Sequence, residues 1–586
     1  MTELVDNVWN FLTEVDKWKV IGSASITFLT IVLIRRMVRK RSVMSRIKKK
    51  QEQLQEARSR LRDRVRTCPP LSHFKELDAL QVQQRLQANE MTPLEALRLY
   101  QKRMVDALES NCICEIIEEA EAVAMSVSAD VQSPIRGMPV SVKENIQVAG
   151  YDSPIGLVSG VLDPAKEDSV LMKVLRKVGA VPFVTTTMSP TGMSLDASTE
   201  IYGKQRNPLD VKRLAGGSSS GEATLLAKGG SPLGFGTDIG GSIRIPATFC
   251  GICGLRPTSY RVSTIGLRSV AKVGSANVRP TVGPMAKCTS LLADAMKAIL
   301  CSAMFELDSR VPELPFNDRI YSGTEPLVIG YYTCIGEELA VRPVVAVEAA
   351  MHKVISLLRS KGHKLVKFSV PDPDKLIRIS TTALIADGGA SLLKATRDDP
   401  TNPRFRQTLR FFSLPVFIRR LIAWFNYRFI SKLIGTTTRS SIGCQSAQDV
   451  LNLLGEVSDY QVEFSKAWSE AKIDVLISPA TPFPAPLDTT PDMLLPGVSN
   501  FLLPYNVLDY PAGVLPVAKV SAADVKASKN AEERYRRDGD WLNAEVSSLQ
   551  EGTQGLPIGL QVVGKPLCEE IVLRVMHEVE LGVSEA

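Results

Sequence analysis

Two serines set among glycines are the residues of this sequence best suited to covalent chemistry. Ser218 and Ser242 lie twenty-four residues apart in the stretch 216–258, which reads GGSSSGEATLLAKGGSPLGFGTDIGGSIRIPATFCGICGLRPT. Glycines beside a serine let the backbone approach a substrate closely and direct successive N–H groups at one point. The Ile-Gly-Gly-Ser run at 239–242 could therefore form an oxyanion hole for acyl transfer.

Three other interpretations fit this stretch less well. A flexible Gly/Ser linker would not contain Asp238, Arg244 and the apolar residues between them. A phosphate-binding loop would need Gly-Lys-Ser/Thr after the glycines, and none follows. An α/β-hydrolase elbow would read Gly-x-Ser-x-Gly and would need a histidine partner. The chain has four histidines, and none lies in a recognisable nucleophile or metal motif.

If histidine is not the base, lysine is the alternative. Lys143 follows the short, largely apolar run 139–142 in the segment GMPVSVKEN, and a strand there would carry it inward. A solvated lysine has a pKa near 10.4, so only about one in 2,500 is neutral at pH 7, and burial would have to lower that pKa. By itself, a lysine that follows a valine is most often a surface residue.

The elements around these residues predict an α/β fold. The segment 92–108 begins with a threonine N-cap and has helical spacing. Short apolar or glycine-flanked runs typical of strands lie at 181–184, 232–237, 327–331, 475–477 and 513–517. This alternation is typical of a large, twisted, mixed β-sheet covered by α-helices.

The cysteines do not predict a disulfide framework or a metal site. Ten cysteines in 586 residues are sparse, and the spacing Cys250-Gly-Ile-Cys253 has no second CxxC or suitably placed histidines beside it. Buried free thiols in a reducing compartment are the simpler interpretation. We expect neither a metal nor a cofactor.

The block 216–247 resembles the signature of the amidase signature family. The matching residues are Gly-Gly-Ser-Ser-Ser-Gly and then Gly-Thr-Asp-Ile-Gly-Gly-Ser-Ile-Arg-Ile-Pro-Ala, with both serines in register. The resemblance extends from about residue 70 through GMPVSVKEN, FCGICGLRPT, VGPMAK, DYPAGVLPV and GLPIGLQVV. Within the family, the segments VPELPF (311–316) and VIGYY (328–332) are most similar to the fatty acid amide hydrolases.

The resemblance implies a Ser-Ser-Lys triad without histidine. Ser242 matches the nucleophile, Ser218 the bridging serine, held with a cis peptide bond in relatives, and Lys143 the base. It further implies that the oxyanion and substrate are bound at Ile239, Gly240, Gly241, Met193 and Ser219, with Ser242 adding a fourth N–H group.

The N-terminal segment predicts a membrane anchor. An uncharged run of fifteen residues lies between Lys19 and Arg35, flanked by the basic sequence RRMVRKR. Such a run is short for a span of about 20 residues, although Trp18 and the flanking cations could extend it. We therefore expect an anchor over 1–36, with a transmembrane helix at about 18–36; a buried core helix is the alternative. The positive-inside rule places the rest of the chain in the cytoplasm.

The segment 37–68 is expected to be a charged, solvated helix that links the anchor to an amidase domain over 69–586. Residues 1–67 contain sixteen Lys/Arg and seven Asp/Glu, a net charge of +9, which leaves about −2 for the remaining chain. The excess positive charge therefore favours a membrane surface, not nucleic acid, as partner.

The segment 402–435 (NPRFRQTLRFFSLPVFIRRLIAWFNYRFISKLIG) predicts a second membrane contact. It contains seven Lys/Arg and no acid, and Pro415 divides it into two helix-length halves. Aromatic residues interleaved with cations suit an interfacial helix pair, and a core hairpin is the alternative. By resemblance this segment matches the membrane-binding cap of the lipid amide hydrolases.

Taken together, these features predict a membrane-bound hydrolase of fatty acid amides, such as N-acylethanolamines and primary amides. By resemblance, we expect a homodimer on an endomembrane of the endoplasmic reticulum type, with its catalytic domain facing the cytoplasm. The alternative enzyme is an amidase or amidotransferase subunit that acts on small soluble amides. A non-catalytic membrane scaffold on a decayed amidase fold is the third interpretation.

Overall fold

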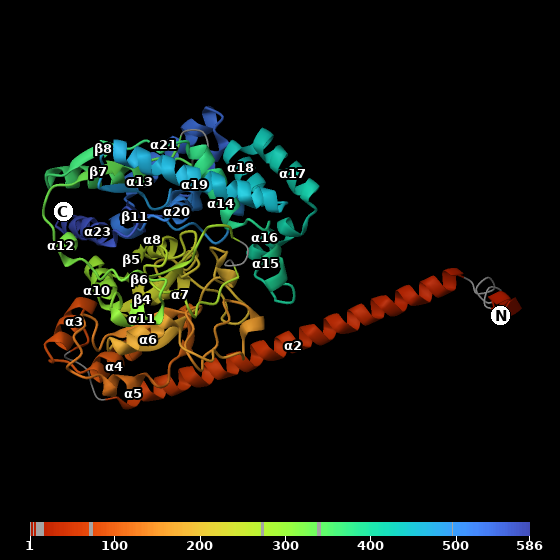
Figure 1. Ribbon diagram of the computed structural model, residues 1–586, viewed down its shortest axis with the longest axis horizontal. Helices are drawn as coiled ribbons and strands as arrows, with labels where there is room; N and C mark the ends of the chain where they lie inside the picture. The colour runs from red at the N-terminus through yellow and green to blue at the C-terminus, as the bar shows by residue number, and fades with distance from the viewer. Residues whose placement is uncertain are drawn as a thin grey trace.

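A mixed β-sheet of eleven strands forms the centre of the computed structural model, which describes residues 2–3, 5–7, 17–68, 74–270, 275–336, 341–494 and 496–585 (Figure 1). The strand order is β1-β3-β2-β4-β6-β5-β10-β11-β9-β7-β8. The strands are β1 Ile113–Ile116, β2 Pro139–Lys143, β3 Val181–Thr186, β4 Leu233–Asp238, β5 Cys253–Arg256, β6 Thr281–Ala286, β7 Val328–Tyr331, β8 Lys364–Lys367, β9 Val475–Pro479, β10 Ala512–Lys519 and β11 Pro557–Val563.

The sheet contains two groups of parallel strands, separated by a run of antiparallel pairs. Strand β2 runs parallel to β3 and to β4, and β7 runs parallel to β8 and to β9. The strands between these groups pair antiparallel. Every residue of β2, β3, β4, β6, β9 and β11 is buried, as expected for a sheet covered on both faces. The predicted α/β fold with a mixed sheet is confirmed.

Helices surround the sheet. In the first half of the chain they are α3 Ala79–Gln87, α4 Pro93–Ala107, α5 Ala120–Ser126, α6 Val170–Lys177, α7 Ser220–Ala227, α8 Arg244–Cys250, α10 Thr289–Ile299, α11 Ser302–Leu307 and α12 Asp318–Tyr321. In the second half they are α13 Val345–Ser360, α14 Pro373–Leu384, α15 Ala390–Ala395, α16 Pro403–Ser413, α17 Val416–Phe425, α18 Lys432–Ser440, α19 Ala447–Glu470, α20 Pro496–Leu508, α21 Ala522–Arg537, α22 Trp541–Ser548 and α23 Glu569–Ser584. The α4 helix begins at the predicted Thr92 cap, which makes a capping box with Glu95.

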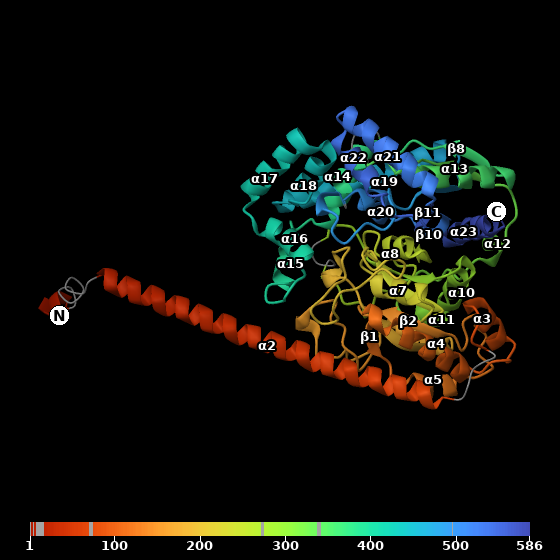
Figure 2. The same ribbon diagram turned by 180° about the vertical axis from the view of Figure 1, so that it is seen from behind.

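The helix α2 (Lys17–Thr67) is one continuous rod of 51 residues that leaves the body and ends far from it (Figures 1 and 2). Its C-terminal half packs against the body through Ile47, Leu54 and Leu61, which are 1–5% exposed. These residues follow a seven-residue spacing and so lie along one side of the helix. The expectation of a solvated linker over 37–68 is therefore wrong for this half of α2, because a narrow apolar stripe docks it to the body.

The predicted transmembrane segment, 18–36, lies within α2, but many of its side chains fall outside the described residues. Among the described residues, no helix contains an uncharged apolar stretch of the length that a bilayer crossing requires. A helix at this position is thus confirmed, and a membrane span is not.

The basic and aromatic insert forms α16, α17, a π-helical turn at Asn426–Ile430, and the start of α18. Seven of its apolar residues are 36–71% exposed: Phe417, Leu421, Trp424, Phe425, Tyr427, Phe429 and Ile430. In both views, α16–α18 lie on the side of the body toward which α2 projects (Figures 1 and 2). Phe405 and Phe412, which the pattern grouped with this aromatic face, are 1% and 5% exposed and belong to the core instead.

The ten cysteines are all free thiols. Cys112, Cys114, Cys250 and Cys253 are buried, and the other six are partly exposed. The interpretation as free thiols is confirmed, although burial applies to only these four.

Candidate active site

The side chain of Lys143 lies at the end of β2 and is completely buried. Its Nζ lies 2.7 Å from Ser218 Oγ, 2.9 Å from Thr237 Oγ1 and 3.3 Å from the Thr237 carbonyl oxygen. Strands β2 and β4 run parallel and adjacent, so their ends bring Lys143 and Thr237 together. The sequence therefore carries this lysine inward on a strand, as predicted.

Burial lowers the pKa of Lys143 to about 7, although the nearby carboxylates of Asp238, Glu144 and Glu222 act in the opposite direction. Near neutral pH, about half of such lysines are neutral and can accept a proton. Burial also raises the pKa of Glu144 and of Glu222 to about 7. The two glutamates therefore place less than their full negative charge beside the lysine.

Both of these glutamates are anchored by hydrogen bonds. Glu222 accepts from Ser141 and, at 2.7 Å, from Thr186 Oγ1. Glu144 accepts the Met188 N–H at 3.0 Å and the Cys114 thiol at 3.3 Å. These hydrogen bonds thus connect the segments around Cys114, Thr186, Met188 and Glu222 to the end of β2 that carries Lys143.

Ser218 lies in the tight segment that precedes α7. The Gly217–Ser218 peptide bond is cis. A Cβ on Gly217 would lie 2.2 Å from the Ser194 carbonyl oxygen, so only glycine fits there. The N–H of the next residue, Ser219, donates to the Ser242 carbonyl oxygen at 3.0 Å and so joins the two serine segments.

Ser242 lies in the turn between β4 and α8, in the same pocket as Ser218. Its side-chain hydroxyl has no hydrogen-bond partner among the described residues, and the residue is 7% exposed. The hydroxyl is therefore available to a substrate. Catalytic hydrogen bonds between such serines are often completed only when substrate binds.

The turn at 239–242 presents backbone N–H groups, but not all four. Gly241 adopts φ +107° and donates its N–H to Asp238 Oδ1 at 2.8 Å. The N–H groups of Ile239, Gly240 and Ser242 have no acceptor among the described residues. Asp238 therefore accepts the N–H group of Gly241 in this structure, and the role of Gly241 as an oxyanion donor stays a prediction.

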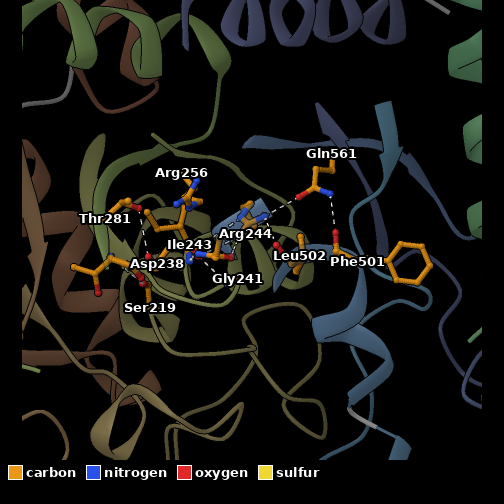
Figure 3. Close-up of polar contacts among 12 residues, drawn as sticks. Ser219, Asp238, Gly241, Ile243, Arg244, Arg256, Thr281, Phe501, Leu502 and Gln561 are labelled. Carbon is orange, nitrogen blue, oxygen red and sulfur yellow. Dashed lines mark hydrogen bonds and ion pairs between the residues drawn. The ribbon is translucent and has the colours of Figure 1, made fainter. Parts of the chain in front are cut away.

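A buried ion pair holds the turn in place. Arg244 Nε and Nη2 lie 3.0 and 3.1 Å from the two carboxylate oxygens of Asp238 (Figure 3). Burial alone would raise the pKa of Asp238, but the charge and hydrogen bonds of Arg244 hold it below its usual range. Arg244 also donates to the Leu502 carbonyl and to Gln561 Oε1, at 3.0 and 2.8 Å. The turn at 239–242 is thus fixed to α20 and β11.

The two remaining predicted binding residues, Ser219 and Met193, have different surroundings. Ser219 Oγ donates to the Thr237 carbonyl at 3.3 Å, so its hydroxyl connects backbone segments. Met193 instead contributes to an apolar pocket of about 10 Å³ with Val270, Leu384, Ile385, Asp387, Ser391 and Leu392. Gly240 borders the same region, since a Cβ there would lie 3.6 Å from Leu384.

Sequence reasoning did not identify Thr237 and Asn145 as parts of this site. Thr237 Oγ1 bonds to Lys143 Nζ and also accepts from Asn145 Nδ2 at 3.2 Å. Asn145 follows Lys143 by two residues, and Thr237 lies between the two serines, so both were within the quoted motifs. Neither residue type signals chemistry without the geometry.

Comparison with known proteins places the chain in a family. The profile described as Amidase matches residues 95–573. The chain is 35% identical to fatty-acid amide hydrolase 1 of Sus scrofa over 93% of each chain. It is 31% identical to fatty acid amide hydrolase 1 of Caenorhabditis elegans over 87% of this chain and 88% of the other. The chain belongs to the amidase signature family, as its motifs predicted.

The fold agrees with this assignment. A solved structure of a fatty acid amide hydrolase superposes with a TM-score of 0.70 and 23% identity, covering 92% of this chain and 90% of the other. At that identity the likeness supports the fold alone.

Proposed function

We propose that this protein is a membrane-associated serine hydrolase that cleaves fatty acid amides into a fatty acid and an amine. The observation that carries the proposal is the buried Lys143, whose pKa is about 7 and whose Nζ lies 2.7 Å from Ser218. In this proposal Lys143 is the base, Ser218 the proton bridge and Ser242 the nucleophile. It also draws on two relatives that are named fatty acid amide hydrolases.

The proposed reaction proceeds in two balanced halves. Neutral Lys143 takes the Ser218 proton while Ser218 takes the proton of Ser242, whose oxygen attacks the amide carbonyl. The N–H groups of Ile239, Gly240 and Ser242 then stabilise the tetrahedral oxyanion. The C–N bond breaks as the proton returns through Ser218 to the leaving nitrogen. Water then cleaves the acyl ester, which releases the fatty acid and restores Ser242.

A lipid acyl chain suits the apolar side of this site. Met193, Leu384 and Leu392 lie there, and the carboxylate of Asp387, which also lines the pocket, accepts the N–H groups of Gly389 and Ser391. The pocket between them measures only about 10 Å³, so these side chains must move to admit a long chain. A series of N-acyl ethanolamides and primary amides, from two to twenty carbons, tests the proposal directly. Faster turnover of short amides than of long ones would favour a general amidase instead.

The exposed aromatic face on α17 and the following turn supports a membrane contact. Trp424 and Phe429 stack edge to face with centroids 5.8 Å apart, yet both are more than half exposed. Arg420 and Arg428 are exposed beside them, and exposed apolar patches rimmed by cations suit anionic lipid. We extend the proposal to a homodimer on an endomembrane whose catalytic domain faces the cytoplasm, on the strength of the family likeness.

Replacing the proposed nucleophile tests the mechanism. Ser242→Ala should lower kcat by more than about a thousandfold and abolish labelling by a fluorophosphonate probe. Ser220→Ala is a matched control, since the Ser220 hydroxyl is buried without a hydrogen-bond partner in the described structure. Labelling that survives in Ser242→Ala would refute the assignment.

A further inference from the structure

The docked half of α2 covers a small apolar cluster at the edge of the body. Ile47 and Leu54 of α2 pack in this cluster with Cys114, Ile201 and Tyr202, and all five residues are 0–6% exposed. Cys114 lies on β1, which contacts α2 and runs close to it (Figure 2). Because two side chains of α2 belong to the cluster, α2 helps to shield Cys114 and Tyr202 from water.

Polar contacts of α2 hold the backbone on both sides of this cluster. Gln51 Nε2 donates to the carbonyl oxygen of Ile201 at 3.3 Å, and Ile201 directly precedes Tyr202. Lys50 pairs with the carboxylate of Glu115, the residue that follows the cysteine of the cluster. The docked half of α2 therefore fixes both segments whose side chains meet in the cluster.

Cys114 and Tyr202 also contact the glutamate beside the proposed base. Cys114 Sγ lies 3.3 Å from Glu144 Oε2, and the Tyr202 hydroxyl lies 3.4 Å from the same oxygen. The thiol and the hydroxyl are themselves 2.7 Å apart. Glu144 directly follows Lys143 in the chain, and its other carboxylate oxygen accepts the Met188 N–H at 3.0 Å. An unbroken set of contacts thus leads from α2 to the residue next to Lys143.

Shielding from water controls the charge of this glutamate. Burial raises the pKa of Glu144 to about 7, while its hydrogen bonds act in the opposite direction. An ionised Glu144 in turn raises the pKa of Lys143. Water admitted to the cluster would therefore lower the pKa of Glu144 and raise that of Lys143. The other ionisable groups around this pair are Lys50, Cys114, Glu115, Asp152, Tyr202, Glu222, Asp238 and Arg244.

We propose that α2 is a positioning element for the catalytic base: its docked half keeps Cys114 and Tyr202 shielded against Glu144, and its release from the body shifts catalysis to higher pH. The docked and projecting halves form one continuous helix, so a force on the projecting half reaches this contact. The inference rests on the proposed function, in which Lys143 is the base, and adds a way for the N-terminal helix to regulate it.

A matched pair of leucines tests the contact. Leu54 and Leu61 lie two turns apart on one side of α2 and are 5% and 1% exposed, but only Leu54 packs with Cys114 and Tyr202. In the full-length protein, Leu54→Asn should shift the rise of kcat/KM with pH, for a soluble neutral amide, to higher pH by about half a unit to one unit. Leu61→Asn removes as much apolar contact and should leave the rise at the pH of the wild type.

Tyr202→Phe should act in the opposite direction while α2 stays docked. Phenylalanine fills the same space but donates no hydrogen bond to Glu144, so this carboxylate stays neutral to higher pH. The pKa of Lys143 should then fall, and the rise of kcat/KM should move to lower pH by up to about half a unit. A merely structural role for α2 or Tyr202 would lower the rate without displacing the rise in either direction.

Alkylation of thiols measures the cover that α2 provides without any measurement of activity. In the wild type, N-ethylmaleimide followed by peptide mass spectrometry should find Cys114 unmodified, because this thiol is buried and its pKa is raised well above the ordinary value. Leu54→Asn should make Cys114 reactive, and Leu61→Asn should not.

Three results would overturn the proposal. They are the same pH dependence in Leu54→Asn and Leu61→Asn, an undisplaced rise in Tyr202→Phe, and a Cys114 that stays protected in Leu54→Asn. If the wild type hydrolyses no acyl amide, the proposed function itself fails and the positioning role fails with it. Hydrolysis that persists while any of the three results is obtained refutes the role of α2 alone.

Discussion

The buried lysine makes a prediction that links catalysis to folding. In the folded protein the pKa of Lys143 is about 7, whereas an exposed lysine has a pKa of 10.5. Between these values the unfolded chain binds a proton at this position that the folded chain does not. Stability contributed by this residue therefore rises with pH, by about 1.4 kcal/mol for each pH unit. The charged lysine is costly in the folded state at low pH, and deprotonation relieves that cost.

Lys143→Met removes the titration while keeping a side chain of similar length. The difference in free energy of unfolding, wild type minus variant, should grow by about 2.7 kcal/mol between about pH 7.5 and pH 9.5. Urea unfolding of both proteins across this range in one detergent measures it, and pH effects common to both cancel in the difference. The absolute difference at one pH is less informative, since methionine also leaves Ser218 and Thr237 without their lysine partner.

The same group should control the rate. Wild-type kcat/KM for a neutral amide should rise with pH through an apparent pKa of about 7, as Lys143 becomes neutral. The variant should lose most of its activity along with this limb. If the free energy of unfolding has the same pH dependence in the two proteins, this lysine does not titrate near neutrality. The same conclusion follows if kcat/KM of Lys143→Met still rises through an apparent pKa of about 7.

Three further predictions concern the surroundings of the site. Glu144→Gln should shift the rise of kcat/KM with pH to lower pH by up to about one unit, because an ionised Glu144 raises the pKa of Lys143. Glu109→Gln, at an exposed glutamate, is the control, and a rise at the same pH in both variants would contradict this prediction. Lys50→Met should lower the free energy of unfolding by about 3–5 kcal/mol, because it leaves Glu115 and Asp152 as buried acids without an ion-pair partner. Lys48 lies two positions away with a side chain that is 80% exposed, so Lys48→Met should have little effect on the free energy of unfolding. Replacing Phe417, Leu421, Trp424 and Phe429 with serine should slow hydrolysis of a vesicle-borne amide at least about fivefold and leave hydrolysis of a short soluble amide unchanged, because lipid contact depends on buried apolar area. Equal effects on both substrates, or the same effect from serine at the exposed Leu451 and Val462, would exclude a membrane role for these residues.

Local motifs predicted the site better than they predicted its supporting contacts. The serines and the lysine are recognisable because each lies in a short run whose glycines or apolar residues dictate the backbone. Thr237 gave no signal, since a threonine in a strand is ordinary and only the parallel pairing of β2 with β4 places it on Lys143. The occupied N–H of Gly241 was equally invisible, because it depends on where the Asp238 carboxylate turns.

The docking of α2 shows a different limit. Its three buried apolar residues are spaced by seven among many charges, so the segment has no broad apolar face to identify. The polar contacts that hold α2 to the body are also atypical, because they include a buried lysine. Lys50 Nζ pairs with the carboxylate of Glu115 and lies 2.7 Å from Asp152 Oδ2. Buried charges are rare without partners. The sequence does not show that Glu115 and Asp152, about sixty to a hundred residues further along the chain, lie beside Lys50 in the fold.

In the proposed mechanism, the charges around Lys143 explain how a lysine could act as a base. Asp238 is the carboxylate that most strongly favours its protonated form, and an unpaired Asp238 would work against a neutral lysine. The guanidinium of Arg244 binds both oxygens of Asp238 and so opposes that charge, although the paired Asp238 still raises the pKa of Lys143. The same pairing fixes the turn that carries Ser242. One ion pair thus serves two requirements, a base that is neutral near pH 7 and a rigid set of N–H groups, and this accounts for a charged residue being fully buried beneath the site.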